Sequence, residues 1–236
     1  MPTLPTPPGP PGTVLVTGGA SGLGASVVEV ISAAGGWPLV LDKQAPAFDL
    51  ADFRLVDVSD SEATEDAVRS LAETHGGLDA VVAAAGIDNC GPFAKVSTSD
   101  WERVVKVNLF GTAAVVRAAL PYLERSHGRI VTIASTLGLR VAEDATAYCA
   151  SKFGVVGFTR ALAMELAGHV GVTLVVPGGM RTHFFDGRAE QYRPPDEEKL
   201  TPPALVADSI LHALTRPRGC EIRELVVCSE EEPSWP

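Results

Sequence analysis

The chain has 236 residues, of which 46% are hydrophobic and 20% charged, a composition typical of globular proteins and not of disordered ones. At about 150 residues per domain, this length favours one large domain over two small ones. The 19 basic and 29 acidic residues give a net charge of −10, which argues against nucleic acid and anionic membrane surfaces as partners. Because no run of about 18 apolar residues is present, we expect no transmembrane helix.

The two ends of the chain differ in composition from the rest. Residues 1–12 contain six prolines and no Lys or Arg, which indicates a disordered, extended leader rather than a signal peptide. Residues 229–236 form an acidic tail. The four cysteines form no CxxC pair and the five histidines are scattered, so we expect reduced thiols, a cytoplasmic location and no bound metal.

Between these ends, short β-branched runs alternate with longer helical patterns. We expect strands over residues 13–17, 38–41, 53–56, 79–83, 129–134, 172–176 and 224–228. We expect helices over residues 22–34, 60–75, 100–124, 146–168 and 203–214. Strands that alternate with long helices form parallel sheets, and apolar strands without alternation are covered on both faces. The predicted fold class is therefore α/β: one doubly wound, Rossmann-like domain over residues 13–228, with a mostly parallel seven-stranded sheet and helices on both faces.

One long irregular stretch interrupts this alternation. Residues 183–200 carry Phe184, Phe185 and Tyr192 among charges and prolines. Loops of this length are often lids. The stretch is interpreted either as a lid over an apolar substrate or as a mobile surface loop.

The first predicted strand runs directly into a glycine-rich turn and then a helix. Gly18, Gly22 and Gly24 lie within the segment Thr17–Gly24. Glycine lets the backbone turn tightly and approach a ligand, while the start of a helix offers free N–H groups and the positive end of its dipole. A lone glycine cluster is a weak signal, but its place between strand and helix predicts a site for the pyrophosphate of a dinucleotide.

An acidic residue ends the second predicted strand. Asp42 lies 18 residues after Gly24, where a carboxylate can hydrogen-bond both hydroxyls of an adenosine ribose. The same charge would repel a 2′-phosphate, so it favours NAD over NADP. The adjacent Lys43 weakens that inference, and Asp42 alone could be a surface residue in a turn; the glycine loop makes the cofactor interpretation the better one.

A tyrosine and a lysine lie four residues apart in one predicted helix. This spacing puts Tyr148 and Lys152 on one face, one turn apart. A phenol is a poor base at neutral pH, but a nearby ammonium can lower its pKa by roughly 1–3 units towards the range useful for proton transfer. Such pairs also occur by chance on many helices.

Two further polar residues make a chance pair a poor explanation. Ser135 directly follows the fifth predicted strand, at the carboxyl end where a parallel sheet places its chemistry, and its hydroxyl can donate to a substrate carbonyl. Asn108 lies in an apolar stretch of the long helix, where an amide needs hydrogen-bond partners. It could bind a water that carries protons to Lys152.

These motifs, in this order, resemble the short-chain dehydrogenase/reductase family of the classical type over roughly residues 13–228. The family patterns TGxxxGxG, NLxG, YxxxK and PG-xxx-T match Thr17–Gly24, Asn108–Gly111, Tyr148–Lys152 and Pro177–Thr182, and Ser135 lies 13 residues before the tyrosine. The resemblance implies a dinucleotide-dependent oxidoreductase that moves a hydride between a nicotinamide and a secondary alcohol or ketone.

The resemblance also implies a role for each matching position. Gly18, Ser21, Gly22 and Leu23 would hold the pyrophosphate, Asp42 the adenosine ribose, and Asp57 with Val58 the adenine. Ala85 and Gly86 would flank the cofactor, and Pro177, Gly178, Met180 and Thr182 would contact its nicotinamide end. Tyr148 would be the general acid/base, Ser135 the carbonyl anchor, Lys152 the nicotinamide-ribose ligand that depresses the tyrosine pKa, and Asn108 the link in the proton relay.

The chain departs from the family in two places. Ala83–Gly86 replaces the usual NNAG or NAAG, which puts local stability more than chemistry in doubt, and the common DGG segment near the C-terminus is missing. Three alternatives to an NAD-dependent enzyme are an NADP-dependent reductase, a catalytically silent dinucleotide-binding protein, and an extended-type epimerase or dehydratase. Asp42 opposes the NADP-dependent reductase, and the complete catalytic set opposes the silent protein. The segment after Thr182 is too short for the sugar-binding subdomain of an extended-type enzyme.

Two helices suggest self-association. The helices from Asp100 and Thr146 are apolar around most of their circumference, which indicates burial on more than one side. In the related fold these helices form a subunit interface, so we expect a homotetramer, with a dimer as the next possibility. Cys149 is expected to be buried, and Phe93 with the aromatic residues of the 183–200 stretch hints at an apolar small-molecule substrate.

Overall fold

The structure is a computed structural model, and it describes residues 9–47 and 52–235. The strands are β1 (Thr13–Thr17), β2 (Trp37–Asp42), β3 (Asp52–Leu55), β4 (Ala80–Ala83), β5 (Arg129–Ile133), β6 (Gly171–Pro177) and β7 (Glu224–Val227). The α-helices are α1 (Gly22–Ala33), α2 (Ser61–Thr74), α3 (Thr98–Val105), α4 (Thr112–Ser126), α5 (Thr146–Glu165) and α6 (Pro203–Leu214). Each predicted strand and helix is found within a few residues of its expected bounds.

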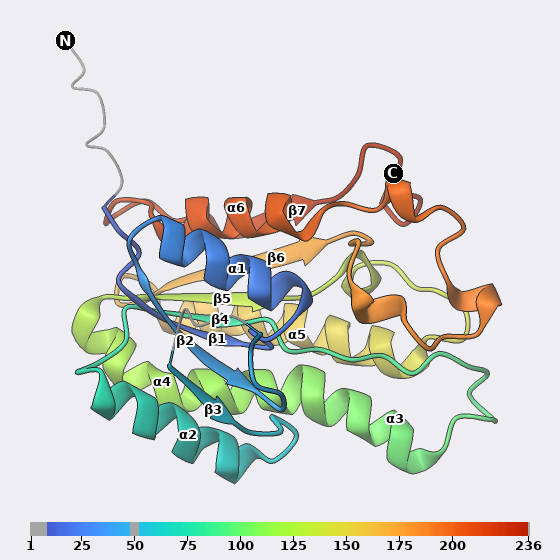
Figure 1. Cartoon of the computed structure of the whole chain (residues 1–236), viewed down its shortest axis with the longest axis horizontal. Coiled ribbons are helices and arrows are strands. Elements are labelled where there is room, and N and C mark those ends of the chain that lie inside the picture. Colours follow the sequence, from blue (N-terminus) through green and yellow to red (C-terminus); the bar gives the residue numbers. More distant parts are fainter. Residues whose placement is uncertain (1–8, 48–51, 236) are drawn as a thin grey trace.

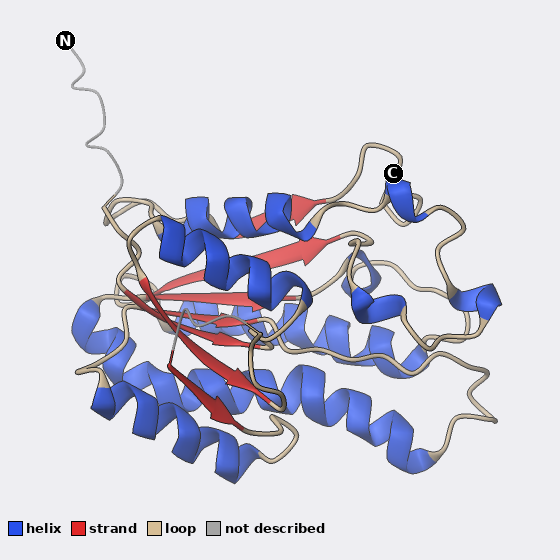
Figure 2. Cartoon of the chain, viewed as in Figure 1, coloured by secondary structure: helices blue, strands red, loops and turns tan. Residues whose placement is uncertain are grey.

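One sheet contains all of these strands, in the order β3-β2-β1-β4-β5-β6-β7. Every pairing between neighbours is parallel, so the sheet is wholly rather than mostly parallel. Figures 1 and 2 show the helices in two layers, with α1 and α6 on one face of the sheet and α2, α4 and α5 on the other. The predicted doubly wound α/β fold is confirmed.

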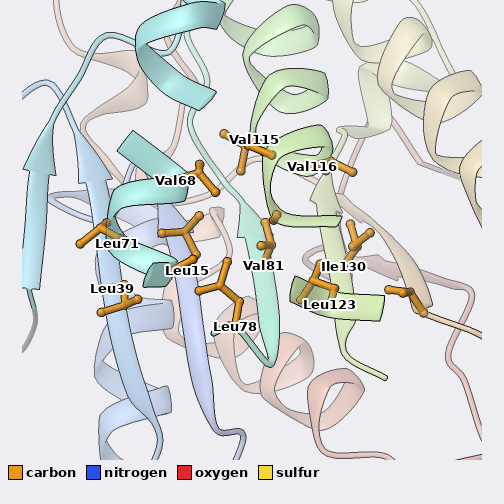
Figure 3. Close-up of a cluster of buried hydrophobic side chains, with 14 of the residues drawn as sticks. Leu15, Leu39, Val68, Leu71, Leu78, Val81, Val115, Val116, Leu123 and Ile130 are labelled. Atoms are coloured by element: carbon orange, nitrogen blue, oxygen red, sulfur yellow. The ribbon is translucent and has the colours of Figure 1, made fainter. Parts of the chain in front are cut away.

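The core is split into two layers by the sheet. Side chains alternate along β1, so that Leu15 belongs to the cluster under α2 and α4 while Val14 and Val16 pack against α1 and α6. Figure 3 shows the first of these clusters, where Leu15 and Val81 from the sheet face the apolar stripes of the two helices. Burial on both faces explains why the central strands are apolar at every position.

The edges of the sheet do not follow that rule. Phe53 and Leu55 of β3 are exposed, and β7 alternates between exposed and half-buried positions. Edge strands have a neighbouring strand on one side only, which leaves side chains in solvent.

The last residues of the predicted disordered leader are ordered. Pro11 is buried and the Gly12 carbonyl accepts from Trp37 N at 2.8 Å, so these two residues pack beside the start of β1 and β2. Residues 1–8 lie outside the described part of the chain.

The long helix predicted from residue 100 to 124 has an irregular centre. A π-helical turn, η1 (Lys106–Gly111), separates α3 from α4 and includes Asn108. A Cβ at Gly111 would lie 2.8 Å from the Val58 carbonyl oxygen, so the widened turn passes close to the loop after β3. The extra residue of a π turn shifts the phase of the apolar pattern, but this shift is not visible in a helix that is apolar around most of its circumference.

The whole stretch Thr98–Ser126 is long and apolar enough to cross a membrane by length and composition, with a mean hydropathy of 1.3 in its most apolar window. More than half of that window is buried inside the fold. Its apolar side chains, such as Val115 and Leu123, form the core beneath the sheet. The stretch therefore packs as a core helix of this domain.

Candidate active site

The glycine loop, residues 18–24, is shaped by contacts that leave no space for a side chain at Gly18 or Gly24. Gly18 has φ +69°, and a Cβ there would lie 2.9 Å from Ala85 Cα. A Cβ at Gly24 would lie 2.1 Å from the Gly18 carbonyl oxygen. Ser21 is the N-cap of α1 and makes no side-chain capping bond there, and Leu23 is buried in the first turn of the helix. The N-terminal amides of α1 therefore face the loop without a side-chain cap.

Asp42 lies beside this loop at the end of β2. Its Oδ2 accepts from Ala20 N at 3.0 Å and its Oδ1 accepts from Gln44 N at 3.0 Å. The carboxylate thus fixes the glycine loop as well as carrying a negative charge at the ribose position that the sequence predicts. Its neighbour Lys43 is exposed.

The pair expected at the adenine lies on the next loop. Asp57 accepts from Ser59 N at 3.0 Å and from the Arg103 guanidinium at 2.9 Å, and these contacts, the backbone bond foremost, lower its pKa. The Val58 side chain is buried against the η1 turn. The Asp57 carboxylate is therefore already committed to two partners within the chain.

The loop after β4 meets the glycine loop from the other side. Ala85 N donates to Thr17 Oγ1 at 3.1 Å, which ties the ends of β1 and β4 together where the family's usual asparagine is missing. A Cβ at Gly86 would lie 3.5 Å from both Asn108 Oδ1 and Lys152 Nζ. Gly86 is thus the point where the loop passes the predicted catalytic residues.

Three of the four predicted catalytic side chains meet at the carboxyl end of β5. Tyr148 and Lys152, from α5, and Ser135, from the loop after β5, are all at least nine-tenths buried. Lys152 Nζ lies 5.6 Å from the centre of the Tyr148 ring and donates to the Ile133 carbonyl at 2.9 Å. Ser135 also fixes its own turn, since its Oγ accepts from Leu137 N at 3.1 Å.

The electrostatics of this cluster differ from expectation. Burial raises the Tyr148 pKa, and a hydrogen-bonding contact with Ser135 offsets only part of that rise. Burial also lowers the pKa of Lys152 to about 8, which weakens the ammonium as a permanent charge. Burial therefore sets the direction of the Tyr148 pKa, and the depression of that pKa by Lys152 stays a prediction.

Asn108 is satisfied by protein partners. Its Oδ1 accepts from Ile87 N at 2.8 Å, and its Nδ2 donates to the Ile87 carbonyl and to Ser151 Oγ, each at 2.9 Å. Its own carbonyl accepts from Thr112 Oγ1 at 2.8 Å. The amide acts as a clamp between η1, α5 and the loop after β4, while the predicted proton relay stays a prediction.

The β6 loop, residues 178–182, crosses the carboxyl end of the sheet. It begins after Pro177, the last residue of β6, and Met180 pairs with Thr201 through an isolated parallel bridge. Thr182 lies 3.5 Å from the position that a Cβ of Gly22 would take. The predicted pyrophosphate and nicotinamide segments are thus brought face to face.

The substrate loop, residues 183–200, is folded over the tyrosine by three contacts. The Phe184 ring lies 5.6 Å from the Tyr148 ring, between centroids. Arg188 donates to the buried Asp88 at 3.0 Å, and Tyr192 Oη donates to Asp144 at 2.6 Å. The loop is therefore anchored at both halves, as a lid would be.

The structure brings some of the predicted aromatic residues together and separates others. Phe185 packs edge-on against Phe184, with ring centroids 5.5 Å apart. Phe93, in contrast, is 70% exposed and lies outside this group. Cys149 is buried, as expected from its place beside Tyr148. Over residues 9–47 and 52–235, no cluster of three or more His, Cys, Asp or Glu side chains is arranged to bind a metal.

Sequence reasoning did not identify Asp88, Arg188 or Glu232 as part of this site. The Arg188 guanidinium lies over both Phe184 and Phe185, at 4.8 and 4.7 Å from the ring centres. Asp88 could have been found, because it follows Gly86 at the same edge of the sheet. Arg188 and Glu232 carry no local signal, since their hydrogen-bond partners, Asp88 and Gly179, lie 100 and 53 residues away in the sequence.

Comparison with known proteins shows the family of this chain. The sequence profile described as short chain dehydrogenase matches residues 12–193. An uncharacterized oxidoreductase of Staphylococcus aureus is 31% identical over 224 residues, which cover 90% of this chain and 95% of that protein.

Solved structures share the fold. An alcohol dehydrogenase from the archaeon Thermococcus sibiricus, in complex with 5-hydroxy-NADP, has a TM-score of 0.83 at 21% identity and covers 93% of this chain and 97% of its own. The ligand-free aldohexose dehydrogenase of Thermoplasma acidophilum has a TM-score of 0.83 at 25% identity, with 92% of each chain covered. The chain belongs to the short-chain dehydrogenase/reductase family, the oxidoreductases that act on CH–OH groups with NAD or NADP.

Proposed function

We propose that the protein is an NAD-dependent oxidoreductase that moves a hydride between the cofactor and a secondary alcohol or ketone, with Tyr148 as the general acid/base. The observation that carries this proposal is the buried group of Ser135, Tyr148 and Lys152 at the edge of the sheet where the glycine loop has no room for a side chain at Gly18 or Gly24. An unused catalytic set would have no reason to keep a lysine desolvated beside a tyrosine.

The residues present fit a dinucleotide. The glycine loop and the uncapped start of α1 offer backbone amides for a pyrophosphate. Gly86 leaves open the space beside Lys152 and Asn108, which a larger residue would fill. Gly18, Ser21, Gly22 and Leu23 would hold the phosphates, Asp57 and Val58 the adenine, Ala85 and Gly86 the middle of the cofactor, and Pro177, Gly178, Met180 and Thr182 its nicotinamide end.

The chemistry follows from the buried phenol. When bound, NAD supplies the hydride acceptor at its nicotinamide ring. Ser135 would orient the substrate oxygen by a hydrogen bond, and Tyr148 Oη would take the hydroxyl proton in oxidation or return it in reduction. Lys152 would bind the nicotinamide ribose, and its low pKa lets it pass a proton near neutral pH. Asn108 would hold this group in register and link it to solvent.

The preference for NAD over NADP rests on Asp42. Its carboxylate would accept hydrogen bonds from the ribose hydroxyls and repel a 2′-phosphate. Because Asp42 also holds Ala20 and Gln44, its removal has two consequences that must be separated. A looser glycine loop would weaken NADH and NADPH binding in parallel, whereas loss of the charge would favour NADPH alone.

The test is the affinity of NADH and NADPH for wild type, Asp42→Asn and Asp42→Ala, measured by calorimetry. We expect wild type to bind NADH at least about tenfold more tightly, a difference of about 1.4 kcal/mol. Both variants should lose that preference, and Asp42→Asn should keep more of the loop contacts. Wild type that binds NADPH more tightly would make the enzyme an NADP-dependent reductase. Wild type that binds neither nucleotide would overturn the proposal and leave a catalytically silent protein.

The substrate loop favours an apolar substrate. Phe184 and Phe185 face the site from the loop, and Ile87, Trp101 and Leu137 pack around the tyrosine. Rings and aliphatic groups exclude water from a reacting carbonyl and give weak selection among similar apolar molecules. A panel of secondary alcohols with NAD would rank them, and turnover of sugars alone would contradict this preference.

We also propose that the protein is a cytoplasmic homotetramer, with a dimer as the alternative. Phe110 of η1 and Phe153 and Met164 of α5 are large apolar side chains that are 44% to 82% exposed. Such side chains on two adjoining elements are what a partner subunit would cover. Light scattering should give about four times the chain mass of 24.7 kDa, and a monomer at that mass would contradict the proposal.

A further inference from the structure

The acidic C-terminal segment, residues 229–235, folds back onto the carboxyl end of the sheet. Figure 1 shows the C-terminus at the end of the molecule where β6 points. This short segment contacts loops around the candidate site. Glu231 pairs with Lys199 of the substrate loop, Ser234 Oγ and Thr136 Oγ1 lie 2.7 Å apart, and Arg140 lies 6.0 Å from the Trp235 ring centre.

The central contact is made by Glu232. Its Oε2 accepts from Gly179 N in the β6 loop at 2.9 Å, a charge-assisted bond to backbone. Its Oε1 accepts from Ser234 N at 3.2 Å and from Ser234 Oγ at 2.5 Å, so the segment's own turn orients the carboxylate. A Cβ at Gly178 would lie 2.3 Å from Glu232 Oε2, which shows how closely the side chain lies against the loop.

The β6 loop links the two halves of the candidate site. Towards its end, Thr182 lies against Gly22 of the glycine loop. Two residues later, Phe184 lies against the catalytic Tyr148. A displacement of Gly179 would therefore change the space between the pyrophosphate cradle and the phenol, where a nicotinamide ring must lie if the proposed function holds.

We propose that Glu232, with the C-terminal segment that carries it, positions the β6 loop for the nicotinamide end of the cofactor. Glu232 is a positioning residue, since it acts through Gly179. This inference rests on the proposed function and extends the site to a part of the chain where the family resemblance is weakest. It assigns to the tail a task at one end of the dinucleotide only, because Asp42 and the glycine loop are held by separate contacts.

The experiment compares two nucleotides that differ at that end. NADH carries the nicotinamide ring, and ADP-ribose lacks it. Both dissociation constants are measured by calorimetry for wild type, Glu232→Ala, Glu232→Gln and Glu230→Ala, together with the melting temperature of each protein. Glu230→Ala is the matched control, because Glu230 is exposed in the same segment and makes no polar side-chain contact within residues 9–47 and 52–235.

We expect Glu232→Ala to weaken NADH binding about tenfold while ADP-ribose binding stays within about twofold of wild type. Glu232→Gln should recover part of the loss, because its amide oxygen can still accept from Gly179 N. Glu230→Ala should match wild type for both nucleotides. The blue shift and enhanced emission of bound NADH should diminish in Glu232→Ala alone.

Equal weakening of NADH and ADP-ribose, or no weakening of either, would overturn the inference while the proposed function stands. Wild type that binds neither nucleotide would instead overturn the proposed function, and the inference with it. If Glu232→Ala melts far below wild type, Glu232→Gln takes its place in the test. The ratio of its NADH and ADP-ribose dissociation constants is then compared with the wild-type ratio. A ratio equal to that of wild type counts against the inference there too.

Discussion

The two ends of the candidate cofactor site are built in different ways. The adenosine end, around β1 and β2, is shaped by backbone: Gly18 and Gly24 have no space for a side chain, and the Asp42 carboxylate holds the amides of Ala20 and Gln44, which are 22 and 2 residues away. The catalytic end, around β5 and β6, is held by side chains that come from far apart, such as Arg188 on Asp88 and Glu232 on Gly179. We therefore expect an added side-chain atom at Gly18 or Gly24 to disrupt the adenosine end. We expect the loss of a single side-chain contact at the catalytic end to change the positions of its loops only gradually.

The largest expected effect is at Tyr148. Tyr148→Phe removes one oxygen from a buried ring and keeps its packing against Phe184. Loss of a general acid/base lowers kcat by about 10²–10⁴-fold, and NADH binding should change by no more than about twofold. A stopped-flow or steady-state assay with the best alcohol measures kcat, and a fluorescence titration measures NADH binding. Near-wild-type turnover would show that another group moves the proton.

Gly24→Ala should break the adenosine end. The new Cβ would lie 2.1 Å from the Gly18 carbonyl, so the loop must shift, and we expect a loss of about 1–3 kcal/mol in stability with NADH affinity at least tenfold lower. Gly157→Ala is the control, because it lies exposed in α5 with no atom within 4 Å of the added Cβ. That variant should be as stable as wild type or about 0.5–1 kcal/mol more so, as for glycine in a helix interior. Thermal unfolding of both variants separates crowding from a general effect of alanine.

The same contrast decides what could be predicted from sequence. The glycine spacing, Asp42 and the pair of Tyr148 and Lys152 are local patterns, and each strand of a parallel sheet delivers its carboxyl end to one edge. The fold class follows from those two facts, and so does the choice of candidate site residues, whose roles stay predictions. The pairing of Arg188 with Asp88 spans 100 residues and depends on how an irregular loop folds, so no periodicity encodes it.

Two further features could not be predicted from the sequence, because each depends on contacts between distant segments. The π turn at Asn108 lies close to Val58, a tertiary contact that the sequence does not encode locally, and the apolar circumference of the helix hides the shift in phase. The direction of the Tyr148 pKa depends on how far burial outweighs nearby charges, which only a three-dimensional environment determines. The expected depression of the Tyr148 pKa considered the lysine charge and left out the burial of the phenol.

The buried pair of Asp88 and Arg188 should tune the tyrosine in opposite directions. The Asp88 charge raises the Tyr148 pKa and the Arg188 charge lowers it. In alcohol oxidation, which needs the deprotonated phenol, Asp88→Asn should move the pH midpoint of kcat/KM down and Arg188→Gln should move it up. Each shift should be about 0.5–1 pH unit.

Both variants will also lose stability, because breaking a buried ion pair leaves one charge without its partner. Over a pH range in which the folded fraction stays constant, which circular dichroism checks, the midpoint of the profile does not depend on how much protein is folded and reports the electrostatic effect alone. The double variant should return near the wild-type midpoint. Shifts of the same sign in the two single variants would contradict the assignment and indicate a general loosening of the substrate loop.

The smallest effect is expected at the outer anchor of that loop. Tyr192→Phe removes the hydrogen bond from its hydroxyl to Asp144 and leaves the ring in place. Because Arg188 and Phe184 still hold the inner half, we expect cleavage within residues 183–200 by a dilute protease to be only a few-fold faster and the melting temperature to fall by about 1–2 °C or less. Tyr122→Phe is the matched control, since within the described ranges the Tyr122 hydroxyl makes no hydrogen bond and its ring instead lies under Arg125. If Tyr192→Phe alone abolished the ordered loop, the side-chain contacts of the catalytic end would act as one cooperative unit, and the gradual loss expected of that end would be wrong.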